Sequence, residues 1–167
     1  VLALLGSATA NSTVVSGAVS NWAESGEVQQ FGDGLNYVTA WWSWGGSNTG
    51  YFYGSGGYGI GHISDVAYAT GVTDVTQISD AGSLTFTRNS IGRYGPGTFI
   101  VFRNAFSNYY GVLRIDSIST AYPWPLSGSW WFQTDGSGDF SGRGMPVPEP
   151  GTLALALLAS AWPGGRF

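Results

Sequence analysis

The sequence predicts an all-β fold, an antiparallel β-sandwich of about eight or nine strands. Only 10% of the residues are charged while 16% are aromatic, the opposite of the composition typical of disordered chains. The 27 glycines gather with Ser, Asn and Asp between short apolar runs, as in strands joined by tight turns. No helical period separates these runs, which favours a sandwich and leaves a closed barrel as the alternative.

Short runs rich in aromatic and β-branched residues give the expected strands. They lie at residues 12–19, 36–44, 63–69, 72–78, 84–87, 98–103, 109–118 and 129–134. The Gly/Tyr-rich stretch 51–61 is interpreted as a surface loop with aromatic anchors, or as an edge strand with glycine bulges. Phe140 is expected to begin a closing strand.

Two strands allow more detailed predictions. Residues 98–103 are apolar on both faces, which indicates a central strand buried from both sides. Arg114 and Asp116 lie two residues apart on one strand face, and we expect them to pair.

We expect residues 11–144 to form this domain as a single unit, which is long enough to bury a hydrophobic core. Cysteine is absent, so stability must come from packing or bound ions rather than from disulfides. The net charge of −4 and the lack of basic clusters disfavour nucleic-acid binding, which requires neutralisation of phosphates.

The C-terminal residues 145–167 have a pattern of their own. Val147-Pro148-Glu149-Pro150 precedes an uncharged run of Leu, Ala, Ser and Trp at residues 153–162, and Arg166 lies close to the end. Proline excludes a helix interior, whereas the run after it is helix-forming and apolar on every face. A short apolar C-terminal helix is therefore predicted.

This tail resembles the sorting signal of the PEP-CTERM proteins, in which Val-Pro-Glu-Pro precedes a transmembrane segment and a short basic end. The matching residues are Val147, Pro148, Glu149 and Pro150. The resemblance implies passage through the inner membrane of a Gram-negative bacterium, transient association with that membrane, and processing by an exosortase, a membrane cysteine transpeptidase. The tail departs from the family because its apolar run is shorter than the roughly 20 residues of a bilayer span. The resemblance implies no function for the body.

The N-terminal residues 1–10 also indicate export. The apolar start is followed by Ala8-Thr9-Ala10, the small-residue pattern at which signal peptides end. We interpret residues 1–10 as a signal-peptide remnant cleaved after Ala10, with a native first strand as the alternative.

Catalytic machinery is sparse in the sequence. His62 is the only histidine and no Gly-x-Ser-x-Gly motif is present, which disfavours a serine triad. With one histidine and no cysteine, the sequence excludes zinc sites with the usual Cys/His ligands. Carboxylates are available for an acid pair of the glycoside-hydrolase type, at Glu24, Glu27, Asp65, Asp74, Asp80 and Asp116. Because Asp in turns normally caps backbone amides, we favour a protein that is not an enzyme.

One segment has the spacing of a calcium loop. Asp135, Ser137 and Asp139 place oxygen-bearing side chains two residues apart. Phe140 occupies the position where glycine is expected, and no bidentate glutamate follows. A Gly-rich hairpin turn is the alternative, and calcium is the one cofactor that the sequence suggests.

The aromatic residues are the remaining candidates for ligand binding. The main candidates are Trp41, Trp42, Trp44, Trp130 and Trp131. Alternation along a strand places the members of each adjacent pair on opposite faces, so one of each is expected nearer to solvent. Exposed rings stack on the apolar faces of sugars. The alternative is that these rings fill both faces of a core.

Together these observations predict an exported cell-surface or extracellular β-domain with a structural or adhesive role in an exopolysaccharide or biofilm matrix. A carbohydrate-binding module and an enzyme resembling a glycoside hydrolase are the alternatives.

Overall fold

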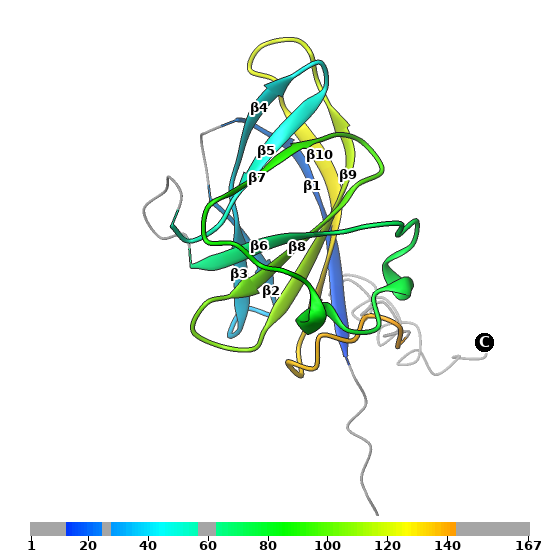
Figure 1. Cartoon of the computed structure of the whole chain (residues 1–167). Helices are drawn as coiled ribbons and strands as arrows, with labels where there is room; N and C mark the ends of the chain where they lie inside the picture. Colours follow the sequence, from blue (N-terminus) through cyan, green and yellow to red (C-terminus); the bar gives the residue numbers. More distant parts are fainter. Residues whose placement is uncertain (1–12, 25–27, 57–62, 143–167) are drawn as a thin grey trace, which may run out of the picture.

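A computed structural model describes residues 13–24, 28–56 and 63–142 of the chain. Within these residues ten antiparallel strands form three sheets (Figure 1). The predicted all-β, sandwich-like fold is confirmed. The predicted C-terminal helix lies outside the described residues.

The largest sheet has five strands in the order β1-β10-β9-β8-β6. Its strands are β1 (Val14–Trp22), β6 (Ser64–Ala69), β8 (Phe99–Asn104), β9 (Tyr110–Ile118) and β10 (Leu126–Gln133). Strands β8, β9 and β10 are consecutive neighbours, so the β8–β9 and β9–β10 loops lie at opposite ends of the sheet (Figure 1).

Two smaller sheets complete the described fold. One pairs β2 (Gln29–Gly32) with β3 (Tyr37–Ala40), and the other has the order β4-β5-β7. The strands of the second are β4 (Trp42–Gly46), β5 (Thr49–Tyr53) and β7 (Ser90–Tyr94). The predicted strand at 36–44 is thus divided at Trp41, where the chain passes from one small sheet to the other.

The five-stranded sheet is buried on both of its faces. In β8, Ile100 and Phe102 belong to the core shared with the small sheets, whereas Phe99 and Val101 belong to a second core on the opposite face. All four side chains are at most 1% exposed. The prediction of a central strand at 98–103 is confirmed, since β8 lies between β9 and β6.

The second core is covered by segments that the sequence predicted to be strands. The strand predicted at residues 72–78 is wrong, because this segment contains the short 3-10 helix η1 (Val75–Gln77). Asp74 and Gln77 form a reciprocal capping box around η1, an interaction that apolar alternation does not reveal. The segment 84–87 follows a second 3-10 helix, η2 (Ala81–Ser83), and instead of a strand it makes one isolated antiparallel bridge, from Thr87 to Val66.

Phe140 also differs from its prediction. It begins no strand; its N–H donates to the carbonyl of Ile78 at 2.8 Å, and its ring is 2% exposed in the second core. The residue therefore anchors the segment after β10 over the sheet.

The predicted pairing of Arg114 with Asp116 is confirmed, with 2.6 Å between Nε and Oδ1. A second ion pair, Arg103 to Asp65 at 3.1 Å, links the neighbouring strands β8 and β6. Asp65 is 7% exposed and also accepts a hydrogen bond from Ser55 at 2.8 Å, so it ties the end of β5 to the large sheet.

Candidate functional site

Several residues that the sequence singled out lie outside the described ranges. The sorting motif Val147 to Pro150, the single histidine His62, and Glu27 belong to this group. Export, exosortase processing and membrane association therefore stay predictions at this point.

Trp42 lies in the main core. Its side chain is 0% exposed and its ring contacts Trp22 at 6.1 Å and Phe52 at 6.5 Å between centroids. This ring cannot contact a ligand, and Trp42 leaves the set of candidate binding residues. Trp41, its neighbour on the opposite face, is half-buried, as expected for one member of the pair.

Trp130 and Trp131 are both half-buried, on opposite faces of β10. Trp130 stacks on Phe31 with centroids 5.4 Å apart and planes at 12°. Trp131 lies 6.2 Å from Phe99 and beneath the guanidinium of Arg114 at 5.8 Å. These contacts agree with rings that fill both sides of the sheet.

Trp44 belongs to an aromatic cluster with Tyr122 and Trp124 of the β9–β10 loop. Its ring stacks on Trp124 of the β9–β10 loop, with centroids 4.7 Å apart and planes at 8°. The backbone N–H of Trp44 donates to Glu24 Oε2 at 2.7 Å. Tyr122, 81% exposed, meets Trp124 edge-on at 5.0 Å. Trp124 has φ of 50°, a strained value for a bulky residue that the stack with Trp44 helps to hold.

A row of aromatic and polar side chains lies on the outer face of the β4-β5-β7 sheet. We call it the aromatic row, and it consists of Trp41, Ser43, Tyr51, Tyr53 and Arg93. Phe52 is 0% exposed and packs inward, so strand alternation turns Tyr51 and Tyr53 to the outer face.

Contacts link each member of the aromatic row to the next. The ring of Trp41 lies 4.5 Å from that of Tyr53, whose hydroxyl hydrogen-bonds Ser43 Oγ at 2.8 Å. Ser43 is opposite Tyr51 in the β4–β5 register. Arg93 Nε donates to the Tyr51 hydroxyl at 3.1 Å, with the guanidinium 5.9 Å from the ring centroid. The hydrogen bonds hold the rings in fixed orientations.

Arg93 gives the aromatic row a positive end. Within residues 13–24, 28–56 and 63–142 the ion pairs join Arg103 to Asp65 and Arg114 to Asp116, and none involves Arg93. Its side chain is exposed. A guanidinium whose charge is not compensated, beside an aromatic ring, suits carboxylate or hydroxyl groups of a ligand.

The described carboxylates proposed for an acid pair are each engaged in structural contacts, Asp80 excepted. Asp65 and Asp116 pair with arginines, and Asp74 caps η1 by accepting from the N–H of Thr76 at 2.9 Å. Glu24 accepts from the N–H of Trp44. Asp80 stands before η2 without a side-chain cap.

The calcium candidates form successive turns after β10. Asp135 Oδ1 accepts from Ser137 N at 2.9 Å, and Ser137 Oγ accepts from Asp139 N at 3.2 Å. The hydroxyl of Ser141, together with its N–H, holds the pKa of Asp139 below its ordinary value. These oxygens thus cap backbone amides, as the hairpin-turn alternative expects, and calcium stays a prediction.

Sequence reasoning missed most of the aromatic row. Tyr51 and Tyr53 were interpreted as part of a surface loop or of an edge strand with glycine bulges, whereas β5 lies between β4 and β7. Arg93 belongs to β7, a strand that was not predicted. The alternation Tyr-Phe-Tyr at 51–53 was the available signal, since one apolar ring between two amphipathic rings is typical of a half-buried strand.

Comparison with known proteins gives no assignment: no family model, no curated protein and no solved structure matches this chain. In the described part of the chain, no cluster of three or more His, Asp or Glu side chains is placed to hold a metal ion. No helix among those residues has the length and apolar character needed to cross a membrane.

Proposed function

We propose that this chain is an exported cell-surface or matrix β-domain that adheres to extracellular polysaccharide and is not an enzyme. The observation that carries the proposal is the aromatic row, in which the rings of Trp41, Tyr53 and Tyr51 share one sheet face and both tyrosine hydroxyls are already hydrogen-bonded. A ligand then binds by stacking and hydrogen bonding on a preformed surface, so binding costs little side-chain conformational entropy.

The chemistry of the row specifies its ligand class. Sugar rings present apolar CH faces that stack on Trp and Tyr, while their hydroxyls exchange hydrogen bonds with polar groups such as Ser43 and the tyrosine hydroxyls. Tyr51 and Tyr53 lie two residues apart on β5, so a sugar chain that runs along this strand meets a tyrosine about every 7 Å. Arg93 at one end favours a polysaccharide that carries carboxylates.

We expect the substitution Tyr51→Ala to weaken binding of polygalacturonate about tenfold, or ~1.4 kcal/mol, because it removes the ring next to Arg93 and the hydrogen-bond partner of Arg93. Arg93→Gln should cause a similar loss and flatten the dependence of affinity on salt. Calorimetric titration at low and high ionic strength measures both effects, with neutral dextran as the uncharged comparison.

Tyr68→Ala is the matched control, since Tyr68 is a tyrosine with 43% of its surface exposed that lies on β6, outside the row. Equal affinities for wild type, Tyr51→Ala and Arg93→Gln would contradict the proposal. Release of reducing ends from either polysaccharide would instead favour the hydrolase alternative.

The two ends of the sequence support export. The Ala8-x-Ala10 pattern and the Val147-Pro148-Glu149-Pro150 motif are independent signals that point to the same route. In this proposal an exosortase processes the tail at the inner membrane of a Gram-negative bacterium, after which the domain remains outside the cell.

Replacing Glu149 with alanine is expected to leave the precursor unprocessed in a host that contains an exosortase, because the motif loses its only charged group. Fractionation followed by mass spectrometry of both termini measures the outcome. The control is Glu24→Ala, a glutamate in the body of the chain. Processing of the Glu149 variant at the wild-type rate would argue against the sorting role.

A further inference from the structure

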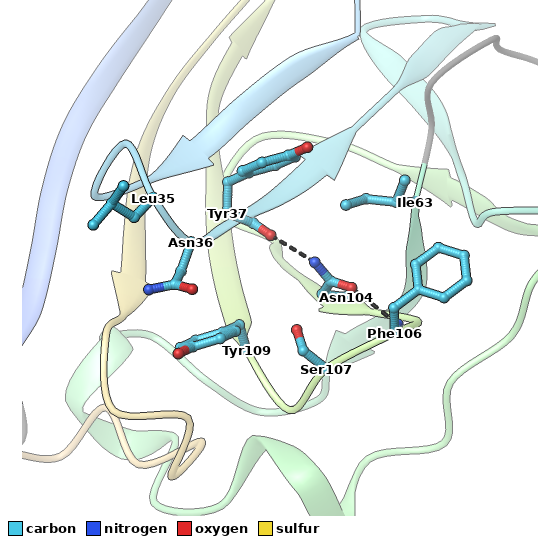
Figure 2. Close-up of a pocket in the computed structure, with 8 residues that line it drawn as sticks. All are labelled: Leu35, Asn36, Tyr37, Ile63, Asn104, Phe106, Ser107 and Tyr109. Atoms are coloured by element: carbon cyan, nitrogen blue, oxygen red, sulfur yellow. Dashed lines mark hydrogen bonds between the residues drawn. The ribbon is translucent and has the colours of Figure 1, made fainter.

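A pocket of about 370 Å³ opens between the β2–β3 turn and the β8–β9 loop, away from the aromatic row (Figure 2). Leu35 and Asn36 approach it from the turn, and Asn104, Phe106, Ser107 and Tyr109 from the loop. Its volume falls within the range of roughly 300–1,000 Å³ that is usual for small-molecule sites. It shares no residue with the aromatic row.

Hydrogen bonds hold both sides of this pocket in place. Asp33 Oδ1 accepts from the N–H of Asn36 at 2.7 Å and of Leu35 at 2.9 Å, which lowers the pKa of Asp33 and fixes the turn. Asn104 Nδ2 donates to the carbonyl of Tyr37 at 3.0 Å and joins the loop to β3 (Figure 2). The pocket therefore exists before any ligand arrives.

Two apolar side chains at this pocket are fully presented to solvent. Leu35 is 90% exposed and Phe106 is 84% exposed, the two highest values for large hydrophobic residues in the described part of the chain. They come from loops about seventy residues apart in sequence, yet both line one pocket. Phe106 also borders a second hollow on the other side of the same loop.

Ser107 supplies a polar group with unused bonding capacity. Its Oγ is buried and has no hydrogen-bond partner among the described residues, although a hydroxyl both donates and accepts. Such a group costs about 1–3 kcal/mol when it is left unpaired. Because this Oγ is buried, the Ser107 side chain must turn toward the pocket before a ligand can hydrogen-bond it, and that hydrogen bond then recovers this free energy.

We propose that this pocket binds a single neutral sugar residue, such as the end of a glycan chain. No charged side chain lines it, so an ionic ligand would find no counter-charge. The rings of Phe106 and Tyr109 suit the CH face of a sugar, and the Asn36 amide and Ser107 hydroxyl suit its hydroxyl groups. An apolar peptide side chain fits less well because it would leave Ser107 Oγ unpaired.

In the test, saturation-transfer NMR measures the binding of the methyl glycosides of glucose, galactose and mannose to the full chain. We expect transfer to at least one glycoside, its loss with Phe106→Ala, and about tenfold weaker binding with Ser107→Ala. Ser107→Ala should leave the melting temperature unchanged or raised, because it removes an unpaired buried hydroxyl. If the role of Ser107 were purely structural, Ser107→Ala would instead lower the melting temperature.

Tyr51→Ala separates this inference from the proposed function, since it disables the aromatic row and should leave glycoside binding intact. Likewise Phe106→Ala should leave polygalacturonate binding at the row intact. The pocket assignment is overturned if no glycoside shows transfer, or if Phe106→Ala and Ser107→Ala leave transfer unchanged. It is also overturned if the pocket binds the apolar probe anilinonaphthalene sulfonate and none of the glycosides.

Discussion

Replacing Trp42 with alanine is expected to lower the free energy of unfolding by about 3–5 kcal/mol, the usual cost of deleting a large buried aromatic side chain. The ring is 0% exposed and joins Trp22 to Phe52, so its loss opens a cavity where the small sheets meet the large one. Urea denaturation followed by circular dichroism measures the change.

Trp42→Phe is the matched variant. It keeps most of the apolar area and removes Nε1, which is buried without a partner among the described residues, so we expect a cost below about 1.5 kcal/mol. Tyr51→Ala on the outer face should change stability still less. A Trp42→Ala protein as stable as wild type would return Trp42 to the set of binding candidates.

Gly111→Ala is expected to cost about 1–3 kcal/mol through overpacking. Gly111 is the second residue of β9, paired with Phe102 on β8 and Phe132 on β10, and a Cβ at this position would overlap Cγ2 of Val38 on β3. Val38 is itself 0% exposed, so it can yield only by displacing its buried neighbours. The close approach of the two sheets therefore depends on glycine at this position.

A double-mutant cycle tests that explanation. Val38→Ala alone removes two buried methyl groups and should cost roughly 2 kcal/mol. In the double variant the new methyl of residue 111 occupies the space that Val38 vacates, so the total cost should fall below the sum by about 1 kcal/mol or more. Additive costs would show that the effect of Gly111→Ala comes from the backbone rather than from this contact.

The parts of the fold that the sequence predicted are those in which side-chain alternation and burial agree. Residues 98–103 and 109–118 are apolar or alternating over their whole lengths, and they became β8 and β9. The same reasoning gave a wrong strand at residues 72–78. There the capping box of Asp74 and Gln77 supplies local hydrogen bonds to the backbone, which outweigh a weak apolar alternation.

The candidate site was predictable only in part. Alternation predicted that one member of the pair Trp41 and Trp42 would lie nearer to solvent, and in the structure that member is Trp41. Alternation cannot show which face meets a second sheet, and for that reason Trp42 was included as well. The pocket was not predictable, because Leu35 and Phe106 line it only through the packing of the β2-β3 sheet against the five-stranded sheet.

One further consequence follows from the way the chain runs directly from β3 into β4. That continuity sends the β2–β3 turn and the β4–β5 hairpin towards opposite poles of the molecule (Figure 1). A glycan terminus held near one pole and a second polymer lying across the sheet near the other would be joined by a single small bridge. Many such bridges turn a viscous solution of polymer into a gel, and a weak affinity at each contact lets that gel yield and heal.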